Sequence, residues 1–232
     1  MARPPETMKA MILAAGRGER LRPLTDRVPK PLVEAGGKPL LGWHLERLAR
    51  AGVRSCVINL SHLGGQIREY CNRHGAGLDI AFSEEVEALE TAGGIAAARE
   101  LLGPAPFLLL NGDVYCETEL APLTRLDLAN DLAHLVLVPN PPHRPDGDFM
   151  LRGDRVGATD GARHTYAGIA VIDPMLVVEI RCGEKAPLAP LLHAAARQGR
   201  LGGRLYAGPW HDVGTLERLA ALNAHLRTAH GA

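Results

Sequence analysis

The chain has no excess of charge of either sign and few aromatic residues. Its 26 Lys and Arg residues balance its 26 Asp and Glu residues, so the formal net charge at pH 7 is zero. A neutral chain has no general attraction for nucleic acid or for an anionic membrane. Aromatic residues make up only 4% of the chain, which argues against a stacking platform for single strands. We therefore expect neither nucleic acid nor a membrane as a partner.

Closely spaced cysteines and long apolar runs are also missing. The four cysteines are far apart and form no C-x-x-C pair, which fits neither a zinc site nor a disulfide framework. The first apolar run, residues 8–15, is too short to span a membrane, and no convincing cleavage site follows it. We expect a cytoplasmic protein with a flexible N-terminal extension at residues 1–7 and one domain over residues 8–232.

Strand-like and helix-like runs alternate through the first half of the chain. The patterns predict strands at 8–15, 55–60, 78–82 and 107–110, and helices at 40–51, 64–72 and 91–102. In the second half they predict strands at 133–138, 148–152 and 165–172, and helices at 188–198 and 216–227. Alternating units with wholly apolar strands are typical of parallel sheets covered on both faces. We expect one α/β domain, Rossmann-like and three-layered, with a mostly parallel sheet and a small antiparallel insertion.

A loop rich in glycine and arginine follows the first predicted strand. Gly16 and Gly18 allow the backbone to approach a ligand closely, and Arg20 and Lys30 add positive charge nearby. The loop matches neither the P-loop pattern nor the dinucleotide pattern G-x-G-x-x-G, whose third glycine is replaced by Leu21. These residue types, placed after an N-terminal strand, predict a site for a nucleoside triphosphate.

Two separate carboxylates are candidate magnesium ligands. Asp113 directly follows the apolar strand 107–110, where ligands gather in open α/β sheets, and Asp212 precedes a glycine and the last predicted helix. Carboxylate oxygens are the ligands that Mg²⁺ prefers. Each residue also has a structural alternative, because Asn-Gly-Asp is good turn chemistry and Asp212 fits a helix cap. Together they favour one shared Mg²⁺ bound to the triphosphate.

The string GxGxRLxPLTxxxPKPL, which begins at Gly16, resembles the signature of the sugar-1-phosphate nucleotidylyltransferases, and the resemblance extends from residue 8 to about residue 225. It implies transfer of a nucleotidyl group from a nucleoside triphosphate to a sugar-1-phosphate. It also implies that Arg20 and Lys30 are catalytic and that Asp113 and Asp212 bind Mg²⁺. The same chemistry follows from the substrates, since a sugar phosphate needs no deprotonation but does need alignment and charge neutralisation.

The resemblance also indicates binding residues. For the nucleotide it implies Leu13, Ala14, Ala15, Gly16, Gly18, Glu19, Arg20, Lys30, Glu85, Val86 and Ala88. For the sugar, carboxylate and glycine chemistry favours Asn111, Asp148 and Gly168. Lys185 is added because Glu-Lys-Ala-Pro at 184–187 is one residue away from the Glu-Lys-Pro whose lysine holds the sugar phosphate in relatives.

Within the family, the chain is most similar to the short bacterial N-acetylmuramate-1-phosphate uridylyltransferases. The motifs that carry this likeness are LETAGG from Leu89, GDF from Gly147, LAPLL from Leu188 and WHDVGT from Trp210. The expected partners are UTP and a sugar-1-phosphate, and the leucine-rich terminal helices leave a homo-oligomer open. A mannose-1-phosphate guanylyltransferase, another hexose-1-phosphate nucleotidylyltransferase and a non-catalytic nucleotide-sugar sensor are the alternatives. The sensor would predict loss of the metal aspartates or of Lys30, and all are present.

Overall fold

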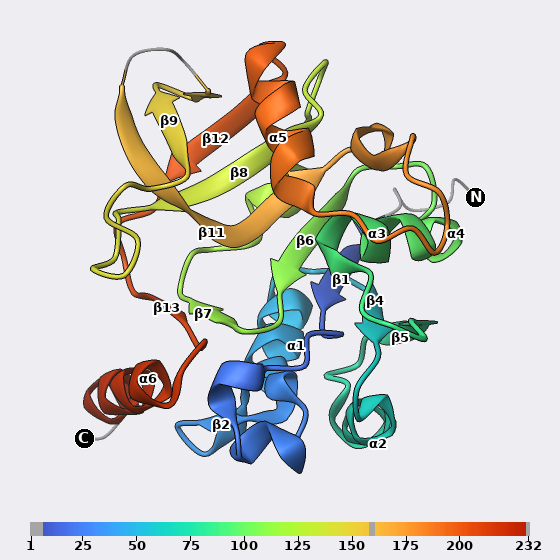
Figure 1. The fold of residues 1–232 in the computed structure, drawn as a ribbon, viewed down its shortest axis with the longest axis vertical. Coiled ribbons are helices and arrows are strands. Elements are labelled where there is room, and N and C mark those ends of the chain that lie inside the picture. Colours follow the sequence, from blue (N-terminus) through green and yellow to red (C-terminus); the bar gives the residue numbers. More distant parts are fainter. Residues whose placement is uncertain (1–6, 158–160, 231–232) are drawn as a thin grey trace.

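The computed structural model describes residues 7–157 and 161–230, and in these residues nine strands form one mixed sheet (Figure 1). The strands are β1 (Ala10–Leu13), β4 (Ser55–Leu60), β5 (Asp79–Glu84), β6 (Phe107–Asn111), β8 (Ala133–Val138), β9 (Phe149–Arg152), β10 (Arg155–Val156), β11 (Ala162–Ile172) and β12 (Leu201–Leu205). Their order is β5-β4-β1-β6-β11-β8-β12-β10-β9, and β11 also pairs with β9. The first-half strands β5, β4, β1 and β6 are therefore neighbours in space.

The expectation of a mostly parallel sheet is wrong. The pairs β1–β4, β1–β6, β4–β5 and β8–β12 are parallel. The pairs β6–β11, β8–β11, β9–β11, β9–β10 and β10–β12 are antiparallel. The cause is β11, an 11-residue strand that runs back along β6 and β8. A parallel neighbour needs a long crossover connection, and the described residues between β8 and β11 contain no helix that would supply one.

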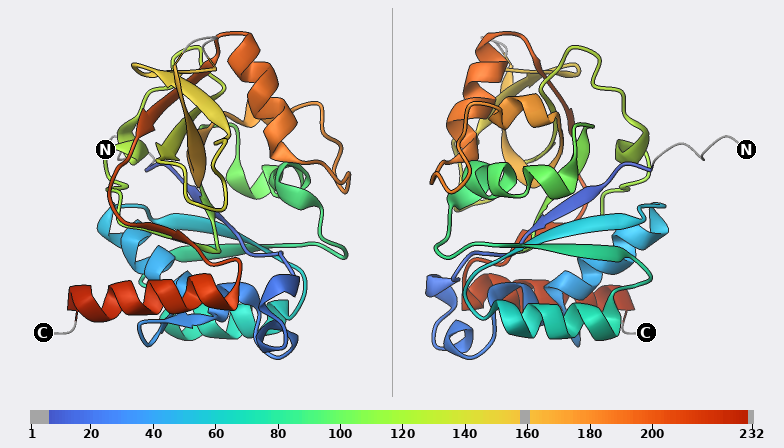
Figure 2. Two further views of the ribbon diagram at one scale, coloured as in Figure 1. Left: turned by 60° about the vertical axis from the view of Figure 1, so that its left-hand side comes forward. Right: turned by 90° about the vertical axis from the view of Figure 1, so that its right-hand side faces the viewer.

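Helices cover both faces of the sheet (Figure 2). On one side lie α1 (Leu40–Arg50), α2 (Gly64–His74) and α6 (Leu216–His230), and on the other lie α3 (Glu90–Ala97), α4 (Arg99–Leu102) and α5 (Leu188–Arg197). Alternation along β1 separates two apolar clusters: Ile12 packs with the helices α1 and α2, and Met11 with α3 and α5. This gives the three layers predicted from the sequence.

Two short strands outside the main sheet matter most for the site. Strand β7 (Val114–Cys116) pairs antiparallel with β13 (Trp210–Asp212), so that Asp212 lies opposite Val114. The Val213 N–H donates to the Asp113 carbonyl oxygen over 2.8 Å, which continues the pairing. A second small hairpin, β2 (Glu34–Ala35) with β3 (Lys38–Pro39), precedes α1. Neither pair was predicted from the sequence.

The other predicted elements are confirmed with shifted ends, except that the single helix expected at 91–102 is divided into α3 and α4 around Ala98. Strand β12 was not predicted. Residues 1–6 of the expected N-terminal extension lie outside the described residues. Among the residues that are described, no helix has both the length and the apolar character needed to cross a lipid bilayer.

Candidate active site

A cavity of about 230 Å³ lies at the carboxyl ends of β1, β4 and β6. Ligands collect at this edge of open α/β sheets. Seven residues predicted to bind nucleotide line the cavity: Leu13, Ala14, Ala15, Gly16, Lys30, Glu85 and Ala88. The glycine loop and the first strand therefore meet the segment after β5 around one space.

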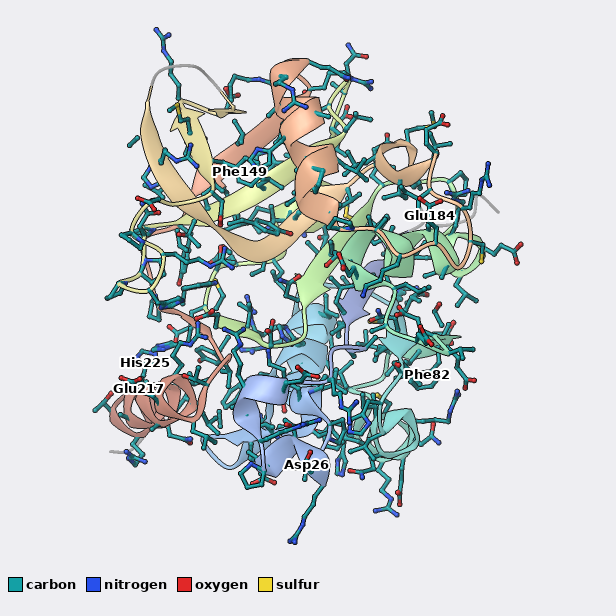
Figure 3. The ribbon with its side chains drawn as sticks, viewed as in Figure 1. Asp26, Phe82, Phe149, Glu184, Glu217 and His225 are labelled. Atoms are coloured by element: carbon teal, nitrogen blue, oxygen red, sulfur yellow. The ribbon has the colours of Figure 1, made fainter. Side chains whose placement is uncertain are left out.

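A second cavity, of about 470 Å³, adjoins the first. Both cavities are lined by Glu90, Thr91, Asn111 and Asp113, which form their junction. The second cavity also contains Arg20, Asp148, Gly168 and Asp212, all of which were predicted as site residues. Its lining includes Phe149, the first residue of β9, which is labelled in Figure 3. The two predicted aspartates and all but one of the predicted sugar residues thus share one space.

Four predicted residues do not line either cavity. Gly18 and Glu19 lie at the start of a short 3₁₀ helix (Glu19–Leu21), and Val86 is fully exposed at the tip of the segment after β5. Lys185 lies outside as well, with its ammonium 3.8 Å from Glu90 Oε1.

Gly18 has a clear packing role next to the first cavity. It adopts φ of +68°, and a Cβ there would lie 3.1 Å from Lys30 Cβ. Its carbonyl oxygen accepts hydrogen bonds from the Leu21 N–H and the Thr25 hydroxyl. Glycine at this position therefore lets the loop fold closely against Lys30.

Each of the two aspartates is ion-paired with a cation of the same chain. The Lys30 ammonium contacts Asp113 Oδ2, and Arg218 on α6 contacts Asp212 Oδ2. His143 Nε2 lies 3.2 Å from the other oxygen of Asp212. The Lys30 and Arg218 side chains are only 12% and 19% exposed, so these contacts lie away from bulk solvent. Sequence reasoning identified Lys30 but missed Arg218 and His143.

Arg20 reaches the same region as Arg218. A Cβ on Gly214 would lie 3.2 Å from Arg20 Nη2, and the Arg218 guanidinium also flanks this glycine. Gly214 is two residues after Asp212, so two guanidinium groups lie beside the Asp212 loop. This concentration of positive charge next to two carboxylates suits an anionic ligand that brings a metal ion with it.

A buried hydrogen-bond chain holds the wall of the first cavity. The Ala14 N–H donates to Asn59 Oδ1 over 2.7 Å, and Asn59 Nδ2 donates to Glu85 Oε1 over 2.7 Å. The other carboxylate oxygen of Glu85 accepts from the Leu89 N–H over 2.9 Å. Asn59 and Glu85 are buried. The chain links the end of β1 to β4 and to the segment after β5. Sequence reasoning missed Asn59, although a polar residue near the carboxyl end of an apolar strand was the available signal.

The three glutamates at the end of β5 and just after it have different environments. Glu84 is exposed and pairs with Arg68, Glu85 is buried in the hydrogen-bond chain, and Glu87 is exposed. Of these three, only Glu85 lines a cavity.

In the second cavity, Asp148 is fixed by two donors. Its Oδ1 lies 3.0 Å from Arg144 Nη1, and its Oδ2 accepts from the Tyr166 N–H over 2.8 Å. Gly168 has φ of +74°, and a Cβ there would lie 2.8 Å from Asn111 Nδ2. Glycine thus lets β11, whose register shifts between Tyr166 and Ala170, press directly against Asn111.

A buried, neutral histidine packs against the segment that contains Asp113. His44 on α1 is buried, and its ring lies against the backbone of Asn111 and Val114. Burial, and to a smaller extent the nearby Arg47 charge, lower the pKa of His44 from 6.5 to about 3. The imidazole is therefore uncharged at neutral pH. Nothing in the sequence pattern distinguished it from an ordinary core residue.

The sequence model that describes nucleotidyl transferases matches residues 9–149. The chain belongs to the nucleotidyl transferase family. The matched range contains the glycine loop, Lys30 and Asp113, and Asp212 lies beyond it. The nucleotidyltransferase expected from the sequence is confirmed.

Two curated relatives and one solved structure are similar to this chain. It is 48% identical to the N-acetylmuramate alpha-1-phosphate uridylyltransferase of Neisseria meningitidis over 225 residues, which cover 94% of this chain and 97% of the relative. It is 32% identical to the mannose-1-phosphate guanylyltransferase catalytic subunit beta of Danio rerio, over 89% of this chain but 61% of that protein. A structure of UDP-glucose pyrophosphorylase with UDP-glucose superposes with a TM-score of 0.77 at 15% identity, over 97% of this chain and all of that one. At that identity the structural likeness shows the fold alone.

Proposed function

We propose that this nucleotidyl transferase moves a uridylyl group from UTP to N-acetylmuramate-1-phosphate, giving UDP-N-acetylmuramate and pyrophosphate. The observation that carries the proposal is 48% identity to the uridylyltransferase of Neisseria meningitidis over nearly the full length of both chains. Two adjoining cavities that share Asn111 and Asp113 agree with a reaction between two substrates. We assign this activity to residues 8–232 as one catalytic domain.

The reaction joins two anions, so the chain must align them and neutralise their charge. A phosphate oxygen of the sugar phosphate attacks the α-phosphorus of UTP and forms a new P–O–P bridge. The bond from the α-phosphorus to the oxygen that bridges to the β-phosphate breaks, and pyrophosphate leaves with that electron pair. Positioning and electrostatic stabilisation account for most of the acceleration of such transfers.

Lys30 and Arg20 are the groups we assign to this task. Lys30 lines the first cavity at its junction with the second, where the α-phosphate and the sugar phosphate would meet. Arg20 lines the second cavity beside the Asp212 loop, and there it would stabilise the departing pyrophosphate. Leu13–Ala15 and the Glu85–Ala88 segment would hold the nucleoside, while Asn111, Asp148 and Gly168 would hold the sugar.

Asp113 and Asp212 fit a Mg²⁺ site. Both are carboxylates, both line the second cavity, and the β7–β13 pairing holds their backbones together. Mg²⁺ is commonly bound by one or two carboxylates, with substrate phosphates and water as the remaining ligands. When bound there, Mg²⁺ would neutralise charge on the triphosphate. Lys30 contacts one carboxylate oxygen of Asp113, and Arg218 contacts one carboxylate oxygen of Asp212.

The test is pyrophosphate release in the presence of Mg²⁺. UTP, GTP, CTP and dTTP are each combined with the 1-phosphates of N-acetylmuramate, N-acetylglucosamine, glucose and mannose. We expect release with UTP and N-acetylmuramate-1-phosphate, and loss of that release in Asp113→Asn. Release only with GTP and mannose-1-phosphate would assign the chain the activity of its guanylyltransferase relatives. Nucleotide binding without release in any combination would refute a catalytic role and favour a nucleotide-sugar sensor.

A further inference from the structure

Glu90 has an unfavourable backbone conformation at the junction of the two cavities. Its φ is +60°, in the left-handed region that side chains with a Cβ rarely adopt. Among the described residues, Leu63, Ala76 and Ala129 share this feature, and none of these three lines either cavity. Strained residues that the surrounding structure maintains are concentrated at functional sites. The position of Glu90 therefore calls for a functional reason.

The segment 184–187 shows which way the Glu90 carboxylate points. Glu90 Oε1 lies 3.8 Å from Lys185 Nζ. The neighbouring Ala186 is hydrogen-bonded to the start of α3, since its carbonyl oxygen accepts from the Ala92 and Gly93 N–H groups over 2.9 and 3.1 Å. Figure 3 shows Glu184 on the loop that passes over α3. The carboxylate is thus turned toward this loop.

This loop leads directly into the sugar side of the site. Pro187 and Leu188, which follow Ala186, line the second cavity and not the first. The opposite wall of the first cavity, formed by Leu13–Ala15, is the side assigned to the nucleoside. Glu90 itself also lines this second cavity, so its carboxylate is placed beside the sugar substrate that we assign to that cavity.

An ionised carboxylate can only accept hydrogen bonds. Ionised phosphates have no protons to donate, whereas a sugar ring offers hydroxyl groups and, in an N-acetylated sugar, an amide N–H. We propose that Glu90 is a specificity-determining residue whose carboxylate accepts hydrogen bonds from such donors on the sugar ring. The inference rests on the proposed function only in that the second cavity holds the sugar phosphate.

The test compares Glu90→Gly and Glu90→Gln with the control Ala129→Gly. Ala129 is exposed, has φ of +49° and lines neither cavity, so its replacement relieves the same kind of strain outside the site. We expect Glu90→Gly to raise the KM for the sugar phosphate about tenfold or more, because a hydrogen bond to a charged group is lost. The KM for the nucleotide should stay within about twofold, and the melting temperature should not fall, since glycine tolerates this φ. Glu90→Gln keeps one acceptor oxygen and should show a smaller effect.

The expected control result is wild-type kinetics in Ala129→Gly. A sugar-phosphate KM within twofold of the wild type in Glu90→Gly would overturn the proposal, as would a rise in the nucleotide KM alone. The comparison uses whichever sugar-1-phosphate the wild-type protein turns over. A different substrate preference would therefore refute the proposed function while leaving the test of Glu90 intact.

Discussion

Replacing Asn59 with alanine removes the central link of the hydrogen-bond chain beside the first cavity. In the wild type, Asn59 accepts from the Ala14 N–H and donates to Glu85, both over 2.7 Å. Asn59 is 3% exposed and Glu85 is 6% exposed. Alanine would leave a buried N–H without its acceptor and would leave the Glu85 carboxylate with the Leu89 N–H as its one remaining partner in this chain.

The expected cost follows from the two broken contacts. A buried donor left unsatisfied costs about 1–3 kcal/mol, and a hydrogen bond to a charged group contributes about 1.5–3 kcal/mol. If water reaches part of the space, the loss lies at the lower end, so we expect about 3 kcal/mol in total. A domain has about 5–15 kcal/mol of stability, so the variant should still fold but unfold at clearly lower denaturant concentration.

The assay is urea unfolding combined with steady-state kinetics, with Asn72→Ala as the matched control. Asn72 is exposed on α2, where alanine is a good helix former. The free energy of unfolding of the Asn72→Ala variant should therefore differ from the wild-type value by less than about 0.5 kcal/mol. In Asn59→Ala we also expect a higher KM for the nucleotide, because Ala14 and Glu85 both line the first cavity, which we propose holds the nucleotide. A loss of less than about 1 kcal/mol, with unchanged nucleotide KM, would show that the chain does not hold this wall.

Three further variants test other parts of the site. The pKa of His44 is lowered to about 3 in the folded protein, so its contribution to stability is complete above about pH 6.5 and falls by about 1.4 kcal/mol per unit as pH decreases below that value. His44→Gln should remove this part of the pH dependence in unfolding curves at about pH 5.5 and 7.5, and an unchanged slope would argue against a buried neutral imidazole. Gly168→Ala should cost about 2–4 kcal/mol on chemical unfolding, because a Cβ would lie 2.8 Å from the Asn111 amide at a positive φ. Lys30→Ala should lower kcat/KM by about 100-fold or more while circular dichroism stays native, and a change below about tenfold would remove Lys30 from the chemistry.

The elements predicted from sequence are those with a long local pattern. Strands such as β4 and β8 are mostly apolar runs, and α1 has a clear apolar face, so these patterns identified them. Strands β7 and β13 have three residues each, too few for any period to show. The direction of β11 is set by its pairing with β6 and β8, which no local pattern encodes. Sheet direction was therefore the part of the fold that the sequence reasoning predicted wrongly.

The candidate site also has residues that the sequence predicted and residues that it did not. The residues of the glycine loop, Asn111 and Asp113 were predicted because their spacing along the chain is itself the signal. Asn59 and Arg218 were missed because each acts through a partner distant in sequence: Asn59 through Glu85, and Arg218 through Asp212. A single asparagine or arginine has many structural uses, so its partner must be known before its role can be inferred.

The pairing of the two aspartates with cations explains how the chain tolerates them in one cavity. Like charges brought together with limited solvent access disfavour each other's ionised form. Lys30 and Arg218 offset this repulsion by placing one positive charge on each carboxylate. A bare nucleotide would add negative charge to a balanced site, whereas a nucleotide carrying Mg²⁺ supplies a cation for the carboxylates. Lys30 also lines the first cavity, so its ammonium lies beside the space in which the phosphates would be held in the proposed reaction. The ion pairs of the two aspartates and the proposed charge neutralisation during transfer therefore use the same residues.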